Sequence, residues 1–170
     1  MSHESVRVWL AEHAPELRLI EGHGSTATVA DAAATLGVAP GRIAKTLAVR
    51  AAGETFLLVA RGDARLANGK CKAVFGARPR MLGPEETLAL TGHPVGGVCP
   101  FGLATSLPVY LDISLQDFET VYPAAGSRTS SLEVAPGRLF ALVATRWVDL
   151  CTLPEFQGAG MTEALQKPGG

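Results

Sequence analysis

The alternation of hydrophobic and polar residues predicts a β-hairpin in the first half of the chain. Residues 42–51, "RIAKTLAVRA", alternate with the period of two that a strand requires. Gly53 marks a turn, and residues 55–60, "TFLLVA", are the expected partner strand. Because side chains two positions apart share a face, the alternation also divides the first strand into two faces.

Lys45 lies on the apolar face of this strand, between Ile43 and Leu47. Burying an ammonium group without a partner is strongly unfavourable, so the position needs an explanation. One interpretation is that Lys45 binds an anionic ligand in a pocket. The other is that the strand lies at a sheet edge, or that its faces are shifted by one residue, so that the amine reaches water.

The remaining patterns mix helices and strands without a regular β-α-β alternation. Thr28 followed by Asp31 resembles a capping box that opens a short helix, and Gly37 ends it. Further helices are predicted at 4–13, 63–75, 83–92 and after a turn at 136–137, and strands at 16–21, 78–82, 107–115, 118–124 and before that turn. This order predicts an α+β fold with a largely antiparallel or mixed sheet.

The composition favours one folded domain without a strong overall charge. The chain has 170 residues, a net charge of −1 and 18% charged residues, so no global field attracts nucleic acid. We expect a single domain over residues 1–152, followed by a tail with glycine and proline over residues 153–170. RNA binding would require a local patch, and a basic stretch offers a candidate that a solvated face also explains: Arg61, Arg65, Lys70, Lys72, Arg78 and Arg80.

Three cysteines without paired spacing indicate reduced thiols and a cytoplasmic protein. The N-terminus is too polar for a signal peptide. The most apolar stretch contains three prolines, which argues against a membrane span.

A glycine-rich loop, "TGHPVGGVCPFGLA" over residues 91–104, is the most distinctive stretch. Gly96 and Gly97 permit positive φ and a close approach of a ligand to the main chain. Successive N–H groups of such a loop can hold an anion or a developing oxyanion. The loop lacks the Gly-Lys-Ser/Thr of a nucleotide-binding loop, and a tight connection without a ligand is the alternative.

Cys99, within this loop, could be a nucleophile if His93 acts as its base, but the commonest role of a lone cysteine is that of a small buried apolar residue. A zinc site from His93, Cys99 and Cys71 lacks the usual paired spacing, so we expect no metal and no cofactor. A polar loop before the predicted helix contains four further candidates: His23, Ser25, Thr26 and Thr28. This loop could face a pocket, or it could be an ordinary turn and helix cap.

Four stretches, taken in order and spacing, resemble the YbaK/EbsC family over residues 20–145. They are "RIAKTLAVR", "TGHPVGGVCPFG", "LPVYLDISLQDFETVY" and "SLEVAPGRL". This family is the free-standing relative of the editing domain inserted in bacterial prolyl-tRNA synthetases. The resemblance implies a compact α+β domain around a curved, barrel-like sheet. It also implies a deacylase that acts in trans on the 3′ CCA end of mischarged tRNA(Pro), with prolyl-tRNA synthetase as a candidate partner.

The resemblance also implies the roles of individual residues. Lys45 matches the family's lysine in its "KTL" setting and would pair with the 3′-terminal phosphate or orient the substrate. The family's GxxxP loop matches Gly96, Gly97, Val98, Cys99 and Pro100, whose main chain would hold the oxyanion while water attacks. A ribose hydroxyl of the substrate would assist, and Cys99 would be a pocket-wall residue.

One position departs from the branch of the family that clears cysteine. "RTSSLEV" places Ser131 where that branch has an aspartate, which weakens assignment to it and leaves the amino acid open. Two alternatives to a deacylase remain: a non-catalytic module that binds aminoacyl-tRNA or RNA, and a thiol esterase that uses Cys99 and His93.

Overall fold

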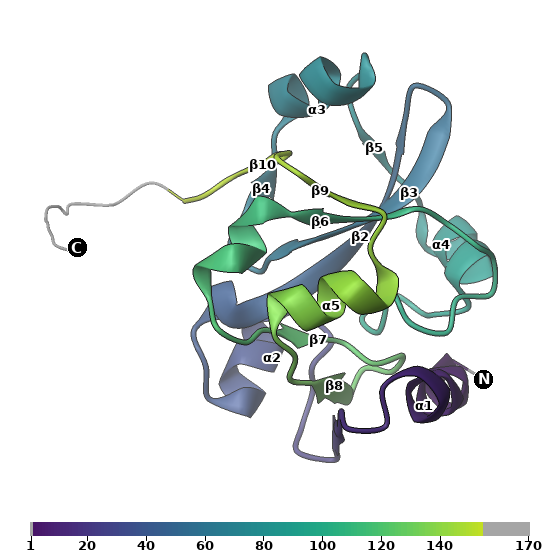
Figure 1. Cartoon of the computed structure of the whole chain (residues 1–170), viewed down its shortest axis with the longest axis vertical. Helices are drawn as coiled ribbons and strands as arrows, with labels where there is room; N and C mark the ends of the chain where they lie inside the picture. Colours follow the sequence, from purple (N-terminus) through teal and green to yellow (C-terminus); the bar gives the residue numbers. More distant parts are fainter. Residues whose placement is uncertain (1, 155–170) are drawn as a thin grey trace, which may run out of the picture.

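A six-stranded mixed sheet forms the centre of the computed structural model, which describes residues 2–154 (Figure 1). The strands β2 (Ile43–Ala51) and β3 (Glu54–Arg61) form an antiparallel hairpin, which confirms the predicted one. The sheet runs in the order β5-β2-β3-β6-β9, and β7 also pairs with β2. The other four strands are β5 (Arg80–Met81), β6 (Val109–Asp112), β7 (Tyr122–Pro123) and β9 (Arg146–Val148).

The sheet is mixed but does not close into a barrel. In the sheet, β2 pairs in parallel with β7, and β6 pairs in parallel with both β3 and β9. Within residues 2–154, β5 and β9 end the sheet at opposite edges, so the barrel-like prediction is wrong. Two separate pairs lie outside it: β1 (Leu19–Glu21) with β8 (Ser130–Leu132), and β4 (Arg65–Leu66) with β10 (Cys151–Thr152).

Helices cover both faces of the hairpin. On one face, Ala44 and Ala48 pack in a buried cluster with Val6 and Leu139. On the other face, Val49 packs in a second cluster. The five helices of the described chain are α1 (Ser2–His13), α2 (Val29–Leu36), α3 (Asn68–Phe75), α4 (Pro84–Thr91) and α5 (Pro136–Val143), with short 3₁₀ turns η1 (Pro40–Arg42) and η2 (Ile113–Asp117). Both faces of β2 are therefore interior.

The predicted cap of α2 is confirmed. Thr28 Oγ1 accepts a hydrogen bond from the Asp31 N–H at 3.0 Å. Gly37 follows the helix with φ of 70°, a left-handed conformation that glycine adopts without strain. The cap fixes the direction in which residues 26–28 approach the sheet.

Several predicted boundaries are wrong for local reasons. The helix α3 begins at Asn68, not at residue 63, because Arg65 and Leu66 pair with β10. The strand β6 ends at Asp112, not at residue 115, because the Asp112 side chain caps η2. The strand expected over 118–124 shortens to β7, and β9 and β10 were not predicted. Most of the predicted tail, residues 155–170, lies outside the described residues.

Asp112 is a structural carboxylate, and we expect Asp112→Ala to destabilise the fold. Its side chain is 1% exposed. It accepts hydrogen bonds from the N–H groups of Ser114 at 3.1 Å and Leu150 at 2.8 Å. Removing it leaves both buried donors unsatisfied, so the free energy of unfolding should fall by about 2–4 kcal/mol in urea titration. A loss below about 0.5 kcal/mol would contradict this role.

Candidate functional site

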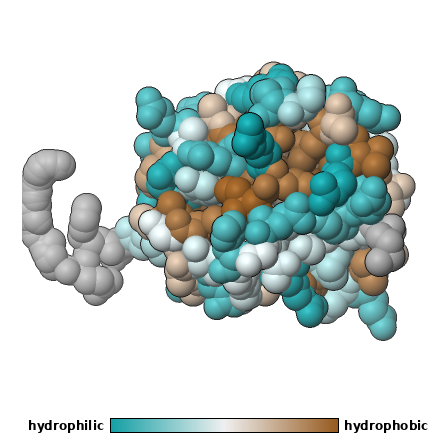
Figure 2. Space-filling view, turned by 90° about the horizontal axis from the view of Figure 1, so that it is seen from below, coloured by the Kyte–Doolittle hydropathy of each residue, from teal (hydrophilic) through white to brown (hydrophobic). Residues whose placement is uncertain are grey.

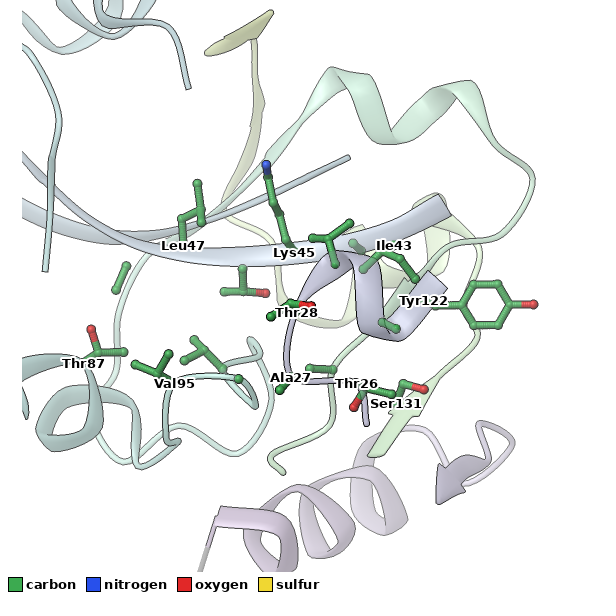
Figure 3. Close-up of a pocket in the computed structure, with 18 of the residues that line it drawn as sticks. Thr26, Ala27, Thr28, Ile43, Lys45, Leu47, Thr87, Val95, Tyr122 and Ser131 are labelled. Carbon is green, nitrogen blue, oxygen red and sulfur yellow. The ribbon is translucent and has the colours of Figure 1, made fainter. Parts of the chain in front are cut away.

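A cavity of about 300 Å³ lies between β2, the residues that lead into α2, and the glycine-rich loop (Figure 3). Val95 and Met81 line it and are about half exposed, so the mouth is apolar. Figure 2 likewise shows a band of hydrophobic surface bordered by hydrophilic side chains on the face seen from below. The volume is at the low end of ligand-binding pockets, which suits a small group.

The glycine-rich loop contributes main chain to the cavity wall. Gly96, with φ of 96°, and Val98 line the cavity. Gly97 does not line it, and its N–H donates to Pro94 O at 2.9 Å within the loop. Among the described residues, no hydrogen-bond acceptor contacts the N–H of Gly96 or Val98. These two N–H groups are therefore candidates to contact a substrate oxygen.

The loop is held by the segment before β8. The Gly126 N–H donates to Gly97 O at 3.1 Å, and Arg128 Nε donates to Val95 O at 2.9 Å. A Cβ on Gly97 would lie 2.7 Å from Ser127 N and 2.9 Å from Gly126 C, so only glycine fits. The close approach fixes the shape of the loop beside the cavity.

Lys45 borders the cavity, but its ammonium lies elsewhere. In Figure 3 its side chain extends from β2 away from Thr28, Ala27 and Val95. Its Nζ donates to Gly62 O at 3.2 Å and to Ala64 O. Burial lowers the pKa of Lys45, while the neighbouring Asp63 opposes that shift. The predicted face of Lys45 is confirmed, whereas its pairing with an anion inside the cavity is not the geometry observed.

Cys99 and His93 are both fully buried and lie outside the cavity lining, so Cys99 is not a pocket-wall residue. His93 Nε2 lies 3.5 Å from Cys99 Sγ, but it donates to Phe101 O at 2.7 Å. The nitrogen near the thiol therefore already carries a proton and cannot act as its base. Burial raises the pKa of Cys99 to about 12. These contacts argue against the thiol esterase.

We expect Cys99→Ser to retain ester-hydrolysing activity within about threefold of the native chain, because an un-ionised buried thiol supplies no nucleophile. The measurement is single-turnover deacylation between pH 6 and 9. A collapse of the rate, with the melting temperature preserved, would reinstate the thiol mechanism.

The predicted polar loop divides into two parts. Thr26 and Thr28 line the cavity, as does Ser131 from β8. His23 is exposed and lies outside the lining, and Ser25 is used locally, where its Oγ donates to Asp31 Oδ2 at 3.1 Å. Of the matched GxxxP loop, Gly96 and Val98 line the cavity, whereas the other three residues lie outside its lining: Gly97, Cys99 and Pro100.

Thr46 also lines the cavity, although nothing in its sequence pattern singled it out as a site residue. Thr46 shares a strand face with Ala44 and Ala48. Small side chains at i−2 and i+2 leave space around a threonine, and that was the available signal. Among residues 2–154, Thr46 Oγ1 and Ser131 Oγ are buried hydroxyl oxygens without a hydrogen-bond partner.

Two members of the basic stretch are paired with carboxylates. Arg61 is paired with Asp63 and Asp117, and Lys70 with Asp149. Within the described range, no three His, Cys, Asp or Glu side chains are grouped as metal ligands would be. Likewise, no helix in residues 2–154 combines the length and apolarity needed to cross a membrane.

Known proteins are similar to this chain in sequence and in fold. Residues 23–142 match the family model described as an aminoacyl-tRNA editing domain. The uncharacterized protein YwhH of Bacillus subtilis (strain 168) is 47% identical over 153 residues, covering 89% of this chain and 98% of YwhH. The proline–tRNA ligase of Moorella thermoacetica is 34% identical over 147 residues, covering 79% of this chain but only 25% of the ligase.

A solved structure agrees with the sequence relationship. It is described as a candidate trans-editing enzyme for prolyl-tRNA synthetase, and it superposes with a TM-score of 0.80 at 33% identity, covering 88% of this chain and 96% of the other. The match to the editing-domain model spans the loop before α2, β2, the glycine-rich loop and β8, which are the segments that build the cavity. The chain therefore belongs to the aminoacyl-tRNA editing domain family.

Proposed function

We propose that this chain is a deacylase that acts in trans and hydrolyses the ester bond of tRNA(Pro) charged with a small, incorrect amino acid. The observation that carries the proposal is the cavity of about 300 Å³ with Gly96 and Val98 of the glycine-rich loop in its wall. That volume suits an aminoacyl group, and the two N–H groups suit its carbonyl oxygen. The resemblance to a candidate trans-editing enzyme supports the same reaction class.

The reaction requires little from the protein beyond positioning. Water attacks the ester carbonyl carbon, and the carbonyl oxygen becomes an oxyanion that the N–H groups of Gly96 and Val98 stabilise. The bond from carbon to the ribose oxygen then breaks. The departing ribose oxygen takes a proton that originates from the attacking water, and the neighbouring ribose hydroxyl assists the transfer. The products are the free amino acid and the uncharged tRNA.

In the proposed reaction, Lys45 contacts the 3′-terminal phosphate of the tRNA. Its present partners, Gly62 O and Ala64 O, are neutral carbonyl oxygens. A phosphate oxygen offers a stronger, charge-assisted hydrogen bond, so the ammonium has reason to exchange partners when the RNA arrives. The four-carbon side chain is flexible, so the ammonium can change partners while the backbone stays in β2.

The test is deacylation of tRNA(Pro) charged with Ala, Cys, Ser, Thr or Pro, under single-turnover conditions. We expect fast loss of at least one incorrect amino acid and retention of proline. If all five esters survive as they do in buffer while the RNA still binds, the chain is a binding module and the proposal is wrong. Repeating the panel on tRNA(Ala) and tRNA(Thr) separates a wrong tRNA body from absent activity.

A further inference from the structure

We propose that the main-chain carbonyl of Thr46 binds the α-ammonium group of the aminoacyl ester, so that the site selects esters of amino acids with a free amino group. The inference rests on the proposed function and identifies the group by which its substrate is recognised. It begins from a gap in the strand pairing along the outer edge of β2, where this strand borders the cavity.

The gap is one outward-facing residue long. One edge of β2 pairs with β3, and the other edge pairs first with β7 and then with β5. On this outer edge, Ala44 pairs with β7, and Ala48 O accepts the Leu82 N–H at 3.0 Å. Within residues 2–154, no strand pairs with the outer edge between these two points. After β7 the chain turns away from β2, and the Gly126 N–H donates to Gly97 O instead.

The strand register shows where the main chain of Thr46 points. In an antiparallel pair, successive residues direct their N–H and C=O alternately toward the partner strand and away from it. The Leu57 N–H donates to Pro108 O at 2.9 Å on the side of β6, so Leu57 and Val59 face away from β2. Thr46 lies opposite Val59. Its N–H and C=O therefore point away from β3 and into the gap, in the same direction as the carbonyl of Ala48.

Burial along β2 places this gap at the cavity. Ala44 and Ala48 are buried, whereas the three residues between them are half-buried and line the cavity: Lys45, Thr46 and Leu47. Thr46 Oγ1 is itself inaccessible, so the exposed atoms of Thr46 belong to its main chain and its hydrocarbon part. A main-chain carbonyl in a protein wall requires a hydrogen-bond donor, and here a ligand in the cavity can supply it.

The chemistry of the cavity favours an ammonium group as this donor. Among the described residues that line the cavity, none is Asp or Glu, so a cationic group must be held by neutral oxygens. A charged donor forms a stronger hydrogen bond than a neutral one. Since β7 and β5 close the gap at both ends, a peptide strand cannot run through it. An aminoacyl ester is a single residue with a free α-ammonium, and it fits these limits.

The first arm of the test compares three ligands that differ only at the α-position. CCA trinucleotides carry alanine, lactate or propionate through an amide bond, which replaces the labile ester. These acyl groups present an ammonium, a neutral hydroxyl and a hydrogen, respectively, and their methyl group cannot donate. We expect the native chain to bind the alanyl ligand at least about tenfold more tightly than the propionyl ligand, with the lactyl ligand between them.

The second arm weakens the Thr46 carbonyl itself. Replacing Leu47 by leucic acid, its α-hydroxy analogue, converts that carbonyl from an amide to an ester, which is a poorer acceptor. The replacement also removes the Leu47 N–H from the pair that Leu47 forms with Leu58. The matched control is the same replacement at Leu58, which removes the other N–H of this pair and weakens the carbonyl of Leu57, outside the cavity lining.

We expect the change at Leu47 to reduce the alanyl-to-propionyl affinity ratio by about threefold or more, and the change at Leu58 to keep the native ratio. The melting temperatures of the two variants should fall by similar amounts, because each variant loses one hydrogen bond of the same pair. A purely structural role of this part of β2 would lower the melting temperatures without changing either ratio.

Three outcomes would overturn the inference. Equal affinity of the native chain for the alanyl and propionyl ligands would mean that the ammonium is not recognised. A native ratio in the Leu47 variant would mean that another group binds the ammonium. An equal fall of the ratio in both variants would assign the effect to the hairpin. The proposed function fails separately: a chain that hydrolyses no ester but shows the expected ratios binds the ammonium as inferred without being a deacylase.

Discussion

Gly97→Ala is expected to reduce deacylation by about 100-fold or more, because it displaces the loop that carries the N–H groups of Gly96 and Val98. The new methyl would lie 2.7 Å from Ser127 N and 2.9 Å from Gly126 C. Both are backbone atoms that cannot rotate away, so the loop must shift. Displacement of a reacting group by about 1 Å can cost about 100-fold in rate. The measurement is kcat/KM on the best ester of the panel, with the free energy of unfolding beside it.

The matched control is Gly69→Ala, in α3. Nothing lies within 4 Å of the Cβ that alanine would add there, and the backbone is helical. This variant should keep full activity and should be more stable by about 0.5–1 kcal/mol, since alanine favours helix. Gly97→Ala should lose about 1–3 kcal/mol to overpacking and still fold. Native activity in Gly97→Ala would mean that the loop does not position the substrate.

Lys45→Ala is expected to lower kcat/KM by about 10- to 100-fold through loss of the phosphate contact. Hydrogen bonds to charged groups contribute about 1.5–3 kcal/mol, and about 1.4 kcal/mol corresponds to a factor of ten. The substitution also removes the bonds from Nζ to Gly62 O and Ala64 O, so a fall in melting temperature is expected. Lys45→Met retains more of the stem and isolates the effect of the ammonium.

The decisive comparison for Lys45 uses two substrates. The native chain and Lys45→Met are assayed on charged tRNA(Pro) and on an aminoacyl-adenosine that has no phosphate. If the ammonium contacts the terminal phosphate, the variant is impaired on the tRNA and equal to the native chain on the adenosine ester. If Lys45→Met is equally impaired on both substrates, Lys45 does not contact the phosphate and only bonds the carbonyl oxygens of Gly62 and Ala64. Lys72→Ala, an exposed lysine on α3, controls for the loss of a positive charge.

Local rules were sufficient for the central hairpin and the cap of α2. The alternation over residues 42–51 and the turn at Gly53 were enough to predict that β2 pairs with β3. Thr28, Asp31 and Gly37 likewise carry their cap in adjacent residues. Such features depend on residues that are neighbours in the sequence, so they can be predicted from the sequence alone.

The position of the cavity could not be derived in the same way. Lys45 is conspicuous in the sequence because it breaks an apolar face, but the pattern does not show what packs against either face of β2. The structure covers both faces. The cavity lies against the face of Ala44, Thr46 and Ala48, whose small side chains read as unremarkable without knowledge of what packs opposite.

Short strands with distant partners also could not be predicted from the sequence pattern. The strands β4 and β10 have two residues each and pair across about half of the chain. Two residues carry no periodicity, so only the tertiary fold specifies them. Equally, the contact of His93 Nδ1 with Ser2 Oγ at 2.7 Å joins residues far apart in the sequence and was not evident from the loop.

The walls of the cavity come from segments that span residues 26 to 131. A chain still being synthesised therefore has no complete site until β8 has emerged and joined β1. The same arrangement means that a bound aminoacyl group links the early and late parts of the chain, so substrate should raise the melting temperature of the entire fold rather than of one loop.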